Sequence, residues 1–472
     1  MSLIAKKIIG EKEFEGELKE IINPYTKEAF TKYVTCTPED AKEALKAAKK
    51  AFEKTKKSRL YQRISLIEDV AKKLEKRKDE FAEFITLEMA KPISQARIEV
   101  TRCIENLKIC AAEGYHILGE TIPTDATKSG AKSVSFYKRV PAGIVVAITP
   151  FNFPLNLVAH KIAPALIAGN SVVLKPTPEA PYTAYAFAKL FIDSEYAIPG
   201  MLNVVYGDAD VGSTLVKSPI PRVISFTGSV PVGKIIIQNA GIKKVTLELG
   251  GNAATFVENS ADLDLAAARC AVGAFANSGQ VCISLQRIYV DSKIYDEFAK
   301  KLGVEASKLK VGSPFEEDTF MGPLINEDAA IRAENWINSA VSEGARIIAG
   351  GKRNGNILAP TILADVTDEM KIVCEEVFAP IVSLVKVNGY EEALEKINNS
   401  PYGLQYSIFT NRIDLTKRAI DDFEAGGVIV NDIPTLRFDI QPYGGMKLSG
   451  LGREGAKYVI EEMTEIKTII IK

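Results

Sequence analysis

The sequence predicts an α/β protein built around parallel β-sheets. Short runs rich in β-branched residues recur from residue 143 onward, and helical stretches separate them. Such strand–helix alternation implies right-handed crossovers between parallel strands. The chain has 472 residues, which is more than one hydrophobic core normally supports, so we expect two or three domains.

The first third of the chain is predicted to be mainly helical. Within 58–80, apolar residues recur on one helical face: Leu60, Ile64, Ile67, Ala71 and Leu74. A second long helix is expected from about 93 to Gly119. The segment 120–140 is polar and rich in turn residues, and its end alternates as a strand does.

Two sets of strands are expected after this helical part. The first set is 143–149, 170–176, 202–207, 222–228 and 244–251. The second set is 253–258, 287–290, 346–351, 379–387, 406–410 and 426–432. We place a domain boundary near Leu249-Gly250-Gly251, between the two sets.

The composition narrows the class of protein. There are 59 basic and 60 acidic residues, which gives no basic surface for nucleic acid. No apolar run reaches the roughly 18 residues that span a bilayer, and the N-terminus lacks the apolar core of a signal peptide, so we expect a cytoplasmic protein without membrane contact. The abundance of Lys, Glu and Ile suggests a heat-adapted source (thermophile).

The cysteines favour neither a disulfide framework nor a zinc site. None of the six is in a CxxC pair, and the chain has two histidines, so we expect no metal. The six are Cys36, Cys103, Cys110, Cys270, Cys282 and Cys374.

Two stretches compete as the nucleotide-binding loop. "GLGREG" at 450–455 has the glycine spacing of a dinucleotide fingerprint, but it does not follow a strand, which favours an ordinary turn. In "ISFTGSVPVGK", a strand leads through Thr227-Gly228-Ser229 into a probable helix start, which suits a pyrophosphate. Lys175, at a strand end, is either a ribose or phosphate contact or a solvated lysine.

Three residues have the chemistry of a covalent catalyst. Cys282 in "NSGQVCIS" follows Gly279, which permits a sharp turn, and a helix start after it would direct N–H groups at the sulfur. On local evidence alone, a structural cysteine remains the alternative. Glu248 ends an apolar strand, where desolvation would raise its pKa as a general base requires. Asn152 lies in a loop after a strand, where its amide could donate to an oxyanion, or it is an ordinary turn residue.

Taken together, the motifs resemble those of the aldehyde dehydrogenase superfamily over nearly the whole chain. The motifs are "ITPFNFPLN", "LKPTPEAP", "FTGS", "LELGG", "NSGQVC", "EEVFAP" and "PYGGMKLSGLGREG", in family order. The resemblance implies a Rossmann-like cofactor domain (1–119 and 141–249), an α/β catalytic domain (250–449) and a small β bridging segment (120–140 and 450–472). The exposed apolar strand at the C-terminus implies a homodimer or homotetramer.

The resemblance also implies roles for individual residues. Cys282 would be the nucleophile, Asn152 and the Cys282 N–H the oxyanion donors, and Glu248 the base that activates water. Cofactor contacts would come from the following residues: Thr149, Pro150, Phe151, Lys175, Thr177, Pro178, Glu179, Gly228, Ser229, Glu376 and Phe378. The substrate pocket would include Phe153, His160, Arg437 and Glu454, of which Glu454 matches an acidic residue in the family's proton path.

The cofactor and the substrate are inferred from departures within these motifs. Members that use NAD often have Glu three residues after the ribose lysine, where this chain has Pro178, so we favour NADP over NAD. His160 stands where succinate-semialdehyde members have Arg, which favours a small hydroxyaldehyde such as lactaldehyde, glyceraldehyde or glyceraldehyde 3-phosphate. The alternative is that His160 is a neutral histidine that only packs.

Three alternatives remain at this point. A succinate-semialdehyde or other semialdehyde dehydrogenase would differ only in its pocket. A CoA-acylating enzyme would usually lack the base at Glu248. A non-catalytic member would lack one of Cys282, Glu248 and Asn152, all of which are present.

Overall fold

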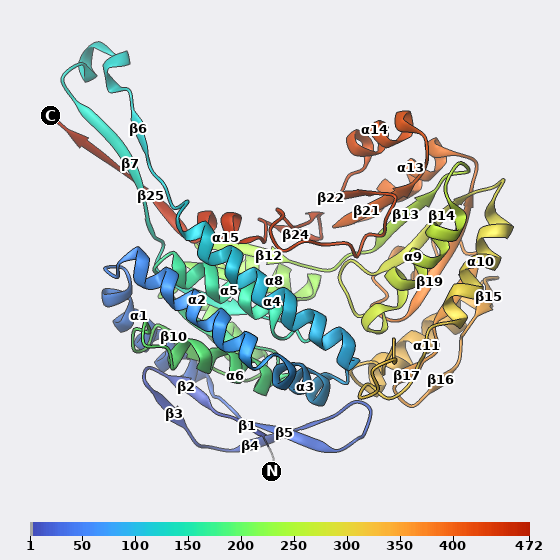
Figure 1. Cartoon of the computed structure of the whole chain (residues 1–472), viewed down its shortest axis with the longest axis horizontal. Helices are drawn as coiled ribbons and strands as arrows, with labels where there is room; N and C mark the ends of the chain where they lie inside the picture. The colour runs from blue at the N-terminus through green and yellow to red at the C-terminus, as the bar shows by residue number, and fades with distance from the viewer. Residues whose placement is uncertain (1–2) are drawn as a thin grey trace.

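The computed structural model describes residues 3–472. Its strands form two large sheets, each covered by helices, and a thin arm that projects from the body (Figure 1). In Figure 1 the arm lies at the upper left and carries the C-terminus, and the lobe on the right is built mainly from residues after 250. The α/β fold class predicted from the sequence is confirmed.

The first sheet has the strand order β24–β12–β11–β8–β9–β10–β2–β3. Its central strands run parallel: β8 (Ile144–Ile148), β9 (Ser171–Lys175), β10 (Leu202–Val204), β11 (Val223–Thr227) and β12 (Lys244–Glu248). Its edges are antiparallel: β2 (Lys7–Ile9), β3 (Lys12–Phe14) and β24 (Gly450–Leu451). The central strands are buried almost throughout, which explains why each is a nearly continuous apolar run.

Nine helices of the described chain pack around this sheet or beside it (Figure 1). They are α1 (Pro38–Thr55), α2 (Leu60–Lys76), α3 (Lys78–Met89), α4 (Ile93–Gly114), α5 (Asn156–Ile167), α6 (Pro181–Ile192), α7 (Ala209–Lys217), α8 (Val230–Ala240) and α15 (Ala456–Glu462). Their apolar faces and the sheet form one core, and the helical face predicted from Leu60 to Leu74 contributes Ile64, Ile67, Ala71 and Leu74 to it.

The order of the strands places a binding site. The chain runs from β8 outward through β9 to β10, then returns to β11 on the other side of β8 and continues to β12. The direction therefore reverses between β8 and β11. In open parallel sheets, ligands bind in the crevice outside the carboxyl ends of the strands at such a reversal.

The second sheet has the order β15–β18–β19–β14–β13–β21–β22. All pairs except β15–β18 are parallel. Its strands are β13 (Ala253–Val257), β14 (Leu285–Asp291), β15 (Arg346–Ala349), β18 (Thr361–Ala364), β19 (Ile381–Val387), β21 (Gln405–Phe409) and β22 (Gly427–Val430). Its helices are α9 (Leu263–Phe275), α10 (Tyr295–Ser307), α11 (Glu327–Ser342), α12 (Lys371–Cys374), α13 (Tyr390–Asn398) and α14 (Ile413–Asp422).

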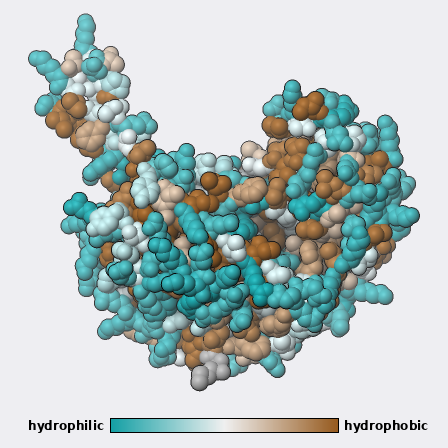
Figure 2. Space-filling view, in the orientation of Figure 1, coloured by the Kyte–Doolittle hydropathy of each residue, from teal (hydrophilic) through white to brown (hydrophobic). Residues whose placement is uncertain are grey.

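The arm is a three-stranded antiparallel sheet of β6 (Glu120–Ile122), β7 (Val134–Pro141) and β25 (Thr464–Ile471). Two short 3₁₀ turns, Thr124–Ala126 and Lys128–Gly130, close its tip. Large apolar side chains remain exposed on these strands, namely Ile122, Val134, Ile466, Ile470 and Ile471. Figure 2 shows apolar surface on the arm.

Smaller sheets complete the molecule. Near the N-terminus, β5 (Ala29–Val34) pairs with β1 (Leu3–Ala5) and β4 (Leu18–Ile22). Two short antiparallel pairs lie elsewhere: β16 (Arg353–Asn354) with β17 (Ile357–Leu358), and β20 (Tyr402–Gly403) with β23 (Met446–Lys447). Over residues 3–472, no helix combines the length and the apolar character needed to cross a membrane.

Some boundaries differ from those predicted. The helix expected to reach Gly119 ends at Gly114, where a Cβ would lie 2.7 Å from the Ile167 side chain, and the chain then turns toward β6. Within 450–472, only β25 lies in the arm; 450–451 pairs with β12, and α15 packs into the first core. The division into domains stays a prediction.

Candidate active site

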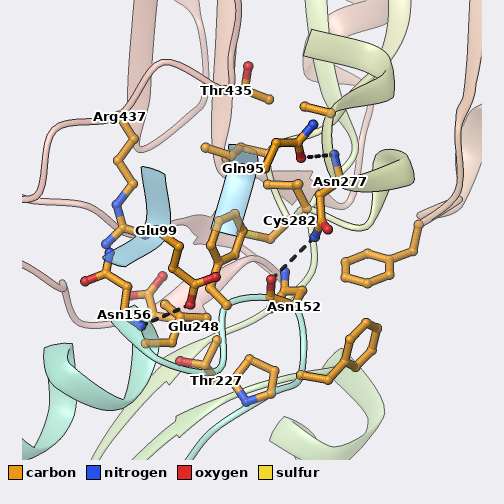
Figure 3. Close-up of a pocket in the computed structure, with 18 of the residues that line it drawn as sticks. Gln95, Glu99, Asn152, Asn156, Thr227, Glu248, Asn277, Cys282, Thr435 and Arg437 are labelled. Carbon is orange, nitrogen blue, oxygen red and sulfur yellow. Dashed lines mark hydrogen bonds between the residues drawn. The ribbon is translucent and has the colours of Figure 1, made fainter. Parts of the chain in front are cut away.

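A cavity of about 760 Å³ lies at the carboxyl ends of β8, β11 and β12. Its opposite wall comes from the second part of the chain, mainly 276–283 and 433–443. Figure 3 shows Cys282, Asn152, Glu248 and Thr227 around this space. The structure thus brings together residues from four separated stretches at the place that the strand order indicates.

The segment before Cys282 makes an unusual turn. Asn277, Ser278 and Gly279 all have positive φ, of 49°, 56° and 69°. At Gly279 a Cβ would lie 2.1 Å from the Ala379 carbonyl oxygen, so this position accepts no side chain. The sharp turn predicted at Gly279 is present. The helix start expected after Cys282 is wrong, because the chain makes a single turn and then enters β14 at Leu285.

Cys282 is partly exposed to the cavity. Its Sγ lies 3.0 Å from the Tyr443 hydroxyl. Burial raises the pKa of the thiol to about 11, and the hydrogen bond from Tyr443 and the charge of Arg437 oppose this rise. The sulfur therefore needs stabilising partners to act as a thiolate.

Asn152 is buried in the loop between β8 and α5. Its Nδ2 donates to the carbonyl oxygen of Gln280 at 3.0 Å, which ties the amide to the Cys282 segment. An amide nitrogen carries two hydrogens, so one bond leaves a second donor. This geometry is compatible with an oxyanion donor beside the sulfur.

A buried ion pair anchors the Asn152 loop. The Nζ of Lys91 donates to Glu99 Oε2 at 2.6 Å and to the Asn152 carbonyl oxygen at 2.6 Å. Glu99 Oε1 accepts from the backbone N–H groups of Leu155 at 2.9 Å and Asn156 at 3.2 Å. Both charged side chains are 1% exposed. The pair therefore holds the loop at the Asn152 carbonyl oxygen through Lys91 and at the N–H groups of Leu155 and Asn156 through Glu99.

Glu248 ends β12 and lines the cavity. Burial raises the pKa of its carboxyl well above the usual value, and the neighbouring charge of Glu454 adds to the rise. Its Oε2 is buried and has no hydrogen-bond partner within residues 3–472. A desolvated carboxyl of this kind is suited to taking a proton.

Glu454, by contrast, has two cationic partners. It accepts from Lys161 Nζ at 3.2 Å and from Arg437 at 2.9 Å. Although burial alone would raise its pKa, these cations lower it to about 2. The "GLGREG" stretch thus places Glu454 at the cavity wall. The environments of Glu248 and Glu454 push their pKa values in opposite directions.

Phe153, Arg437 and Glu454 line the cavity as predicted, but His160 does not. His160 is buried behind the wall, and its Nε2 lies 2.9 Å from Asp439 Oδ1. Asp439 also accepts two hydrogen bonds from Arg102, at 2.7 and 3.0 Å. His160 thus contacts Asp439 and Arg437 and does not line the cavity.

Two threonine hydroxyls near the carboxyl ends of the first sheet have no hydrogen-bond partner in the described chain. Thr149 follows β8 and Thr227 ends β11, on either side of the strand reversal; each Oγ1 is buried without a partner in the described chain. The Gly228 N–H already donates to the Glu248 carbonyl oxygen, so it is not free. Ser229 is the N-cap of α8, whose first N–H groups point outward from the helix start.

Lys175 lies at the end of β9, outside the cavity lining, and is mostly buried. Burial lowers its pKa, and the carboxylates Glu179, Asp208 and Asp210 oppose the change. Thr177 donates a hydrogen bond to Glu179, and Pro178 lies between them. Of the two interpretations of Lys175, its burial disfavours the solvated lysine, and the ribose or phosphate contact stays a prediction.

Glu376 and Phe378 close the cavity on the side of the second lobe. Glu376 Oε1 accepts from the Gly251 N–H at 2.9 Å, and burial raises the pKa of this carboxyl to about 7. At Gly250 a Cβ would lie 2.2 Å from Glu376 Oε2, so the close approach requires glycine. Phe378 meets Phe151 edge to face, with ring centroids 5.9 Å apart, and Pro150 lines the cavity beside them.

Sequence reasoning missed several residues at this site. Tyr443 lies in the motif "PYGGMKLSGLGREG", yet nothing in the local sequence indicates that it contacts Cys282. Lys91 and Glu99 carry a usable signal, because Glu99 falls on the helical face that also carries Ala96 and Val100. A charge on an apolar face is costly unless it is paired.

The family of the chain follows from comparison with known proteins. The model of the aldehyde dehydrogenase family matches residues 12–469. The chain belongs to this family and is an oxidoreductase acting on aldehydes.

Individual relatives narrow the comparison. The chain is 44% identical over 464 residues to a 3-sulfolactaldehyde dehydrogenase of Priestia aryabhattai, covering 98% of this chain and 96% of the relative. It is 42% identical over 456 residues to a lactaldehyde dehydrogenase of Methanococcus aeolicus, covering 96% and 97%. A crystal structure of glyceraldehyde-3-phosphate dehydrogenase GapN from Methanocaldococcus jannaschii complexed with NADP has a TM-score of 0.93 and 40% identity, covering 97% and 99%.

Proposed function

We propose that the protein oxidises a small hydroxyaldehyde to the carboxylic acid through a covalent intermediate on Cys282. The supporting observation is that Cys282, Asn152 and Glu248 meet in one cavity although they lie on three different stretches of the chain. The sulfur adds to the aldehyde carbon, and the Asn152 amide donates to the oxygen that becomes an anion. The resulting thiohemiacetal loses hydride and becomes a thioester.

Hydrolysis of the thioester falls to Glu248. Its buried carboxyl, once ionised, takes a proton from a water molecule, and the hydroxide displaces the Cys282 thiolate. The pairing of Glu454 with Lys161 and Arg437 keeps that carboxylate charged, so it favours the neutral form of Glu248 between turnovers. The presence of this base supports transfer of the acyl group to water over transfer to CoA.

The residues present fit a nicotinamide dinucleotide. Thr149 and Thr227 present buried hydroxyls without partners at the strand reversal, and the start of α8 presents backbone N–H groups beside them. Such a helix start suits a pyrophosphate. When bound there, the nicotinamide would accept the hydride. Glu376, with one oxygen free of Gly251, would hold the adjoining ribose, and Phe151 and Phe378 would border the ring.

We propose NADP as the preferred cofactor. Pro178 places no carboxylate three residues after Lys175, and GapN of M. jannaschii was crystallised with NADP. Glu179, Asp208 and Asp210 act in the other direction, because their charges around Lys175 disfavour an added phosphate. Kinetics with both cofactors therefore determine whether the missing carboxylate at Pro178 or the acidic residues around Lys175 decide the cofactor preference.

The substrate is proposed to be lactaldehyde or a close relative with a short, polar tail. Arg102 and Arg437 both line the cavity, and each is already bonded to a carboxylate, Asp439 or Glu454. Such arginines can still donate their remaining N–H groups to a hydroxyl, phosphate or sulfonate. Similarity to lactaldehyde and 3-sulfolactaldehyde dehydrogenases supports this class.

The remaining expectations concern the oligomeric state, the location and the source of the protein. A homodimer or homotetramer is supported by the exposed apolar side chains of the arm, since an unpaired edge strand such as β25 or β6 favours pairing with another copy. A cytoplasmic location and a heat-adapted source stay predictions.

The test is the initial rate of reduced-cofactor formation from lactaldehyde, run in parallel with NAD and NADP. We expect turnover with a higher kcat/KM for NADP, and a higher kcat/KM for lactaldehyde than for succinate semialdehyde. A clear preference for the semialdehyde would overturn the substrate assignment. A product that forms only in the presence of CoA would overturn the role of Glu248.

A further inference from the structure

Tyr443 is the one side chain that hydrogen-bonds the sulfur of Cys282 within residues 3–472. Its hydroxyl lies 3.0 Å from Sγ although the two residues are 161 positions apart in the chain. The tyrosine is 2% exposed, so its hydroxyl has little water to bond instead. The contact is therefore built by the fold.

The ring of Tyr443 is also held in place. The guanidinium of Arg437 lies over its face, 3.6 Å from the ring centroid, and Arg437 is itself fixed by Glu454. A cation on the face of a phenol draws electron density from the ring and makes the hydroxyl a stronger hydrogen-bond donor. At the other end of the residue, Tyr443 and Glu454 form two backbone hydrogen bonds. Ring and backbone are thus both fixed relative to Glu454.

The charged and titratable groups around the Cys282 sulfur do not fully stabilise its thiolate form. Burial is the largest influence on Cys282 and raises its pKa, and Glu376 and Glu248 add to the rise. Tyr443 and Arg437 oppose it. Because Arg437 is hydrogen-bonded to Glu454, the Tyr443 hydroxyl is the direct partner of the sulfur.

We propose that Tyr443 is a catalytic residue that donates its hydroxyl hydrogen to the Cys282 sulfur and stabilises the thiolate when the thiol loses its proton. This inference rests on the proposed nucleophile role of Cys282. No proton is transferred from Tyr443; the hydrogen bond stabilises the anion that forms when the thiol loses its proton. Once the sulfur is bonded to carbon it is a weak acceptor, and the hydroxyl is released.

The experiment measures alkylation of Cys282 by iodoacetamide as a function of pH, without substrate or cofactor. Cys374 is exposed and would also react, so all proteins carry Cys374→Ser; the other four cysteines are buried. Tyr443→Phe removes only the hydroxyl. Tyr206→Phe is the matched control, because Tyr206 is equally buried but its hydroxyl has no partner in the described chain and lies outside the cavity.

We expect Tyr443→Phe to slow alkylation roughly ten- to hundredfold at about pH 8, because a hydrogen bond to a charged group is lost. The deficit should shrink as pH rises, since the thiol then ionises without help. Tyr206→Phe should match the parent. A ring-fluorinated tyrosine at position 443 is a stronger donor with the same shape, so it should shift the profile to lower pH even if Tyr443→Phe folds poorly.

Two results would overturn the inference. An unchanged profile in Tyr443→Phe would show that the hydroxyl does not support the thiolate. A deficit of the same size at every pH would show that the residue only shapes the cavity. If Cys282 of the parent protein does not react at all, the proposed nucleophile itself is wrong, which separates the two failures.

Discussion

The buried pair of Lys91 and Glu99 gives the most demanding test of how this site is held together. The perturbation is Glu99→Gln, which keeps the shape and an acceptor oxygen for Leu155 and Asn156 but removes the negative charge. Lys91 is then a buried cation, 1% exposed, without a counterion. Burial already lowers the pKa of Lys91, and the charge of Glu99 is the main influence that opposes this.

The magnitude follows from the geometry. At the N–O separation of 2.6 Å, an effective dielectric constant of about 20 gives an attraction of roughly 6 kcal/mol, before the cost of desolvating both ions. Removing one partner of such a buried pair typically costs about 3–5 kcal/mol. We therefore expect the free energy of unfolding of Glu99→Gln to fall by about 3–5 kcal/mol.

Activity should fall as well, because the pair fixes the loop that carries Asn152. Complete loss of an oxyanion donor costs about 10²–10³ in rate. A displaced donor costs less, so we expect kcat/KM to fall by about ten- to hundredfold. The assay is lactaldehyde oxidation together with chemical denaturation, with Glu88→Gln as the control. Glu88 is also a buried glutamate, but it accepts from Tyr182 and Thr183 at the start of α6, away from the cavity.

A double variant separates the two effects. Lys91→Met with Glu99→Gln removes both charges, so part of the stability should return, while activity stays low because the anchor on the Asn152 carbonyl is gone. Full recovery of kcat/KM in the double variant would refute the anchoring role. An unchanged free energy of unfolding in Glu99→Gln would refute the argument from burial.

Four further predictions concern the other parts of the site. Asn152→Ala should lower kcat/KM by about 10²–10³ with an unchanged circular dichroism spectrum; a loss below threefold would exclude it as the oxyanion donor. Glu248→Gln should give a burst of about one reduced cofactor per subunit and then stop, with an acyl-enzyme visible by mass spectrometry. Because burial raises the pKa of Glu248, kcat of the parent should rise with pH as this carboxyl ionises, and a flat profile would contradict its role as base. Pro178→Glu should raise the Kd for NADP at least tenfold and leave that for NAD nearly unchanged, as measured by fluorescence titration.

The sequence was most informative where burial is complete. The strands from 143 to 251 are buried on both faces, so their continuous apolar runs could be recognised without the structure. The strands near the N-terminus were not predicted, because β3 and β4 are exposed and mix charged with apolar residues. Short pairs such as β24 with β12 depend on contacts between distant segments, which no local pattern encodes.

The same reasoning applies to the site. Cys282, Glu248 and Asn152 could be predicted because each stands in a distinctive motif, and the structure brings all three to one cavity. Tyr443 could not be predicted, since its role depends on a contact across 161 residues. His160 was placed by analogy in the pocket, whereas Asp439 holds it behind the wall.

The ion pairs of the site distinguish Glu248 from the other charged groups. Four cations of the site are paired with carboxylates: Lys91 has Glu99, Lys161 and Arg437 share Glu454, and Arg102 has Asp439. These pairs fix the positions of their members. Within the described chain, Glu248 is not in such a pair, and its Oε2 has no partner at all. Burial and the neighbouring Glu454 carboxylate raise the pKa of Glu248 well above its usual value, which favours uptake of a proton, as its proposed role of base requires. The paired charges thus hold the site's shape, and Glu248 stays outside these pairs, as its proposed role of base requires.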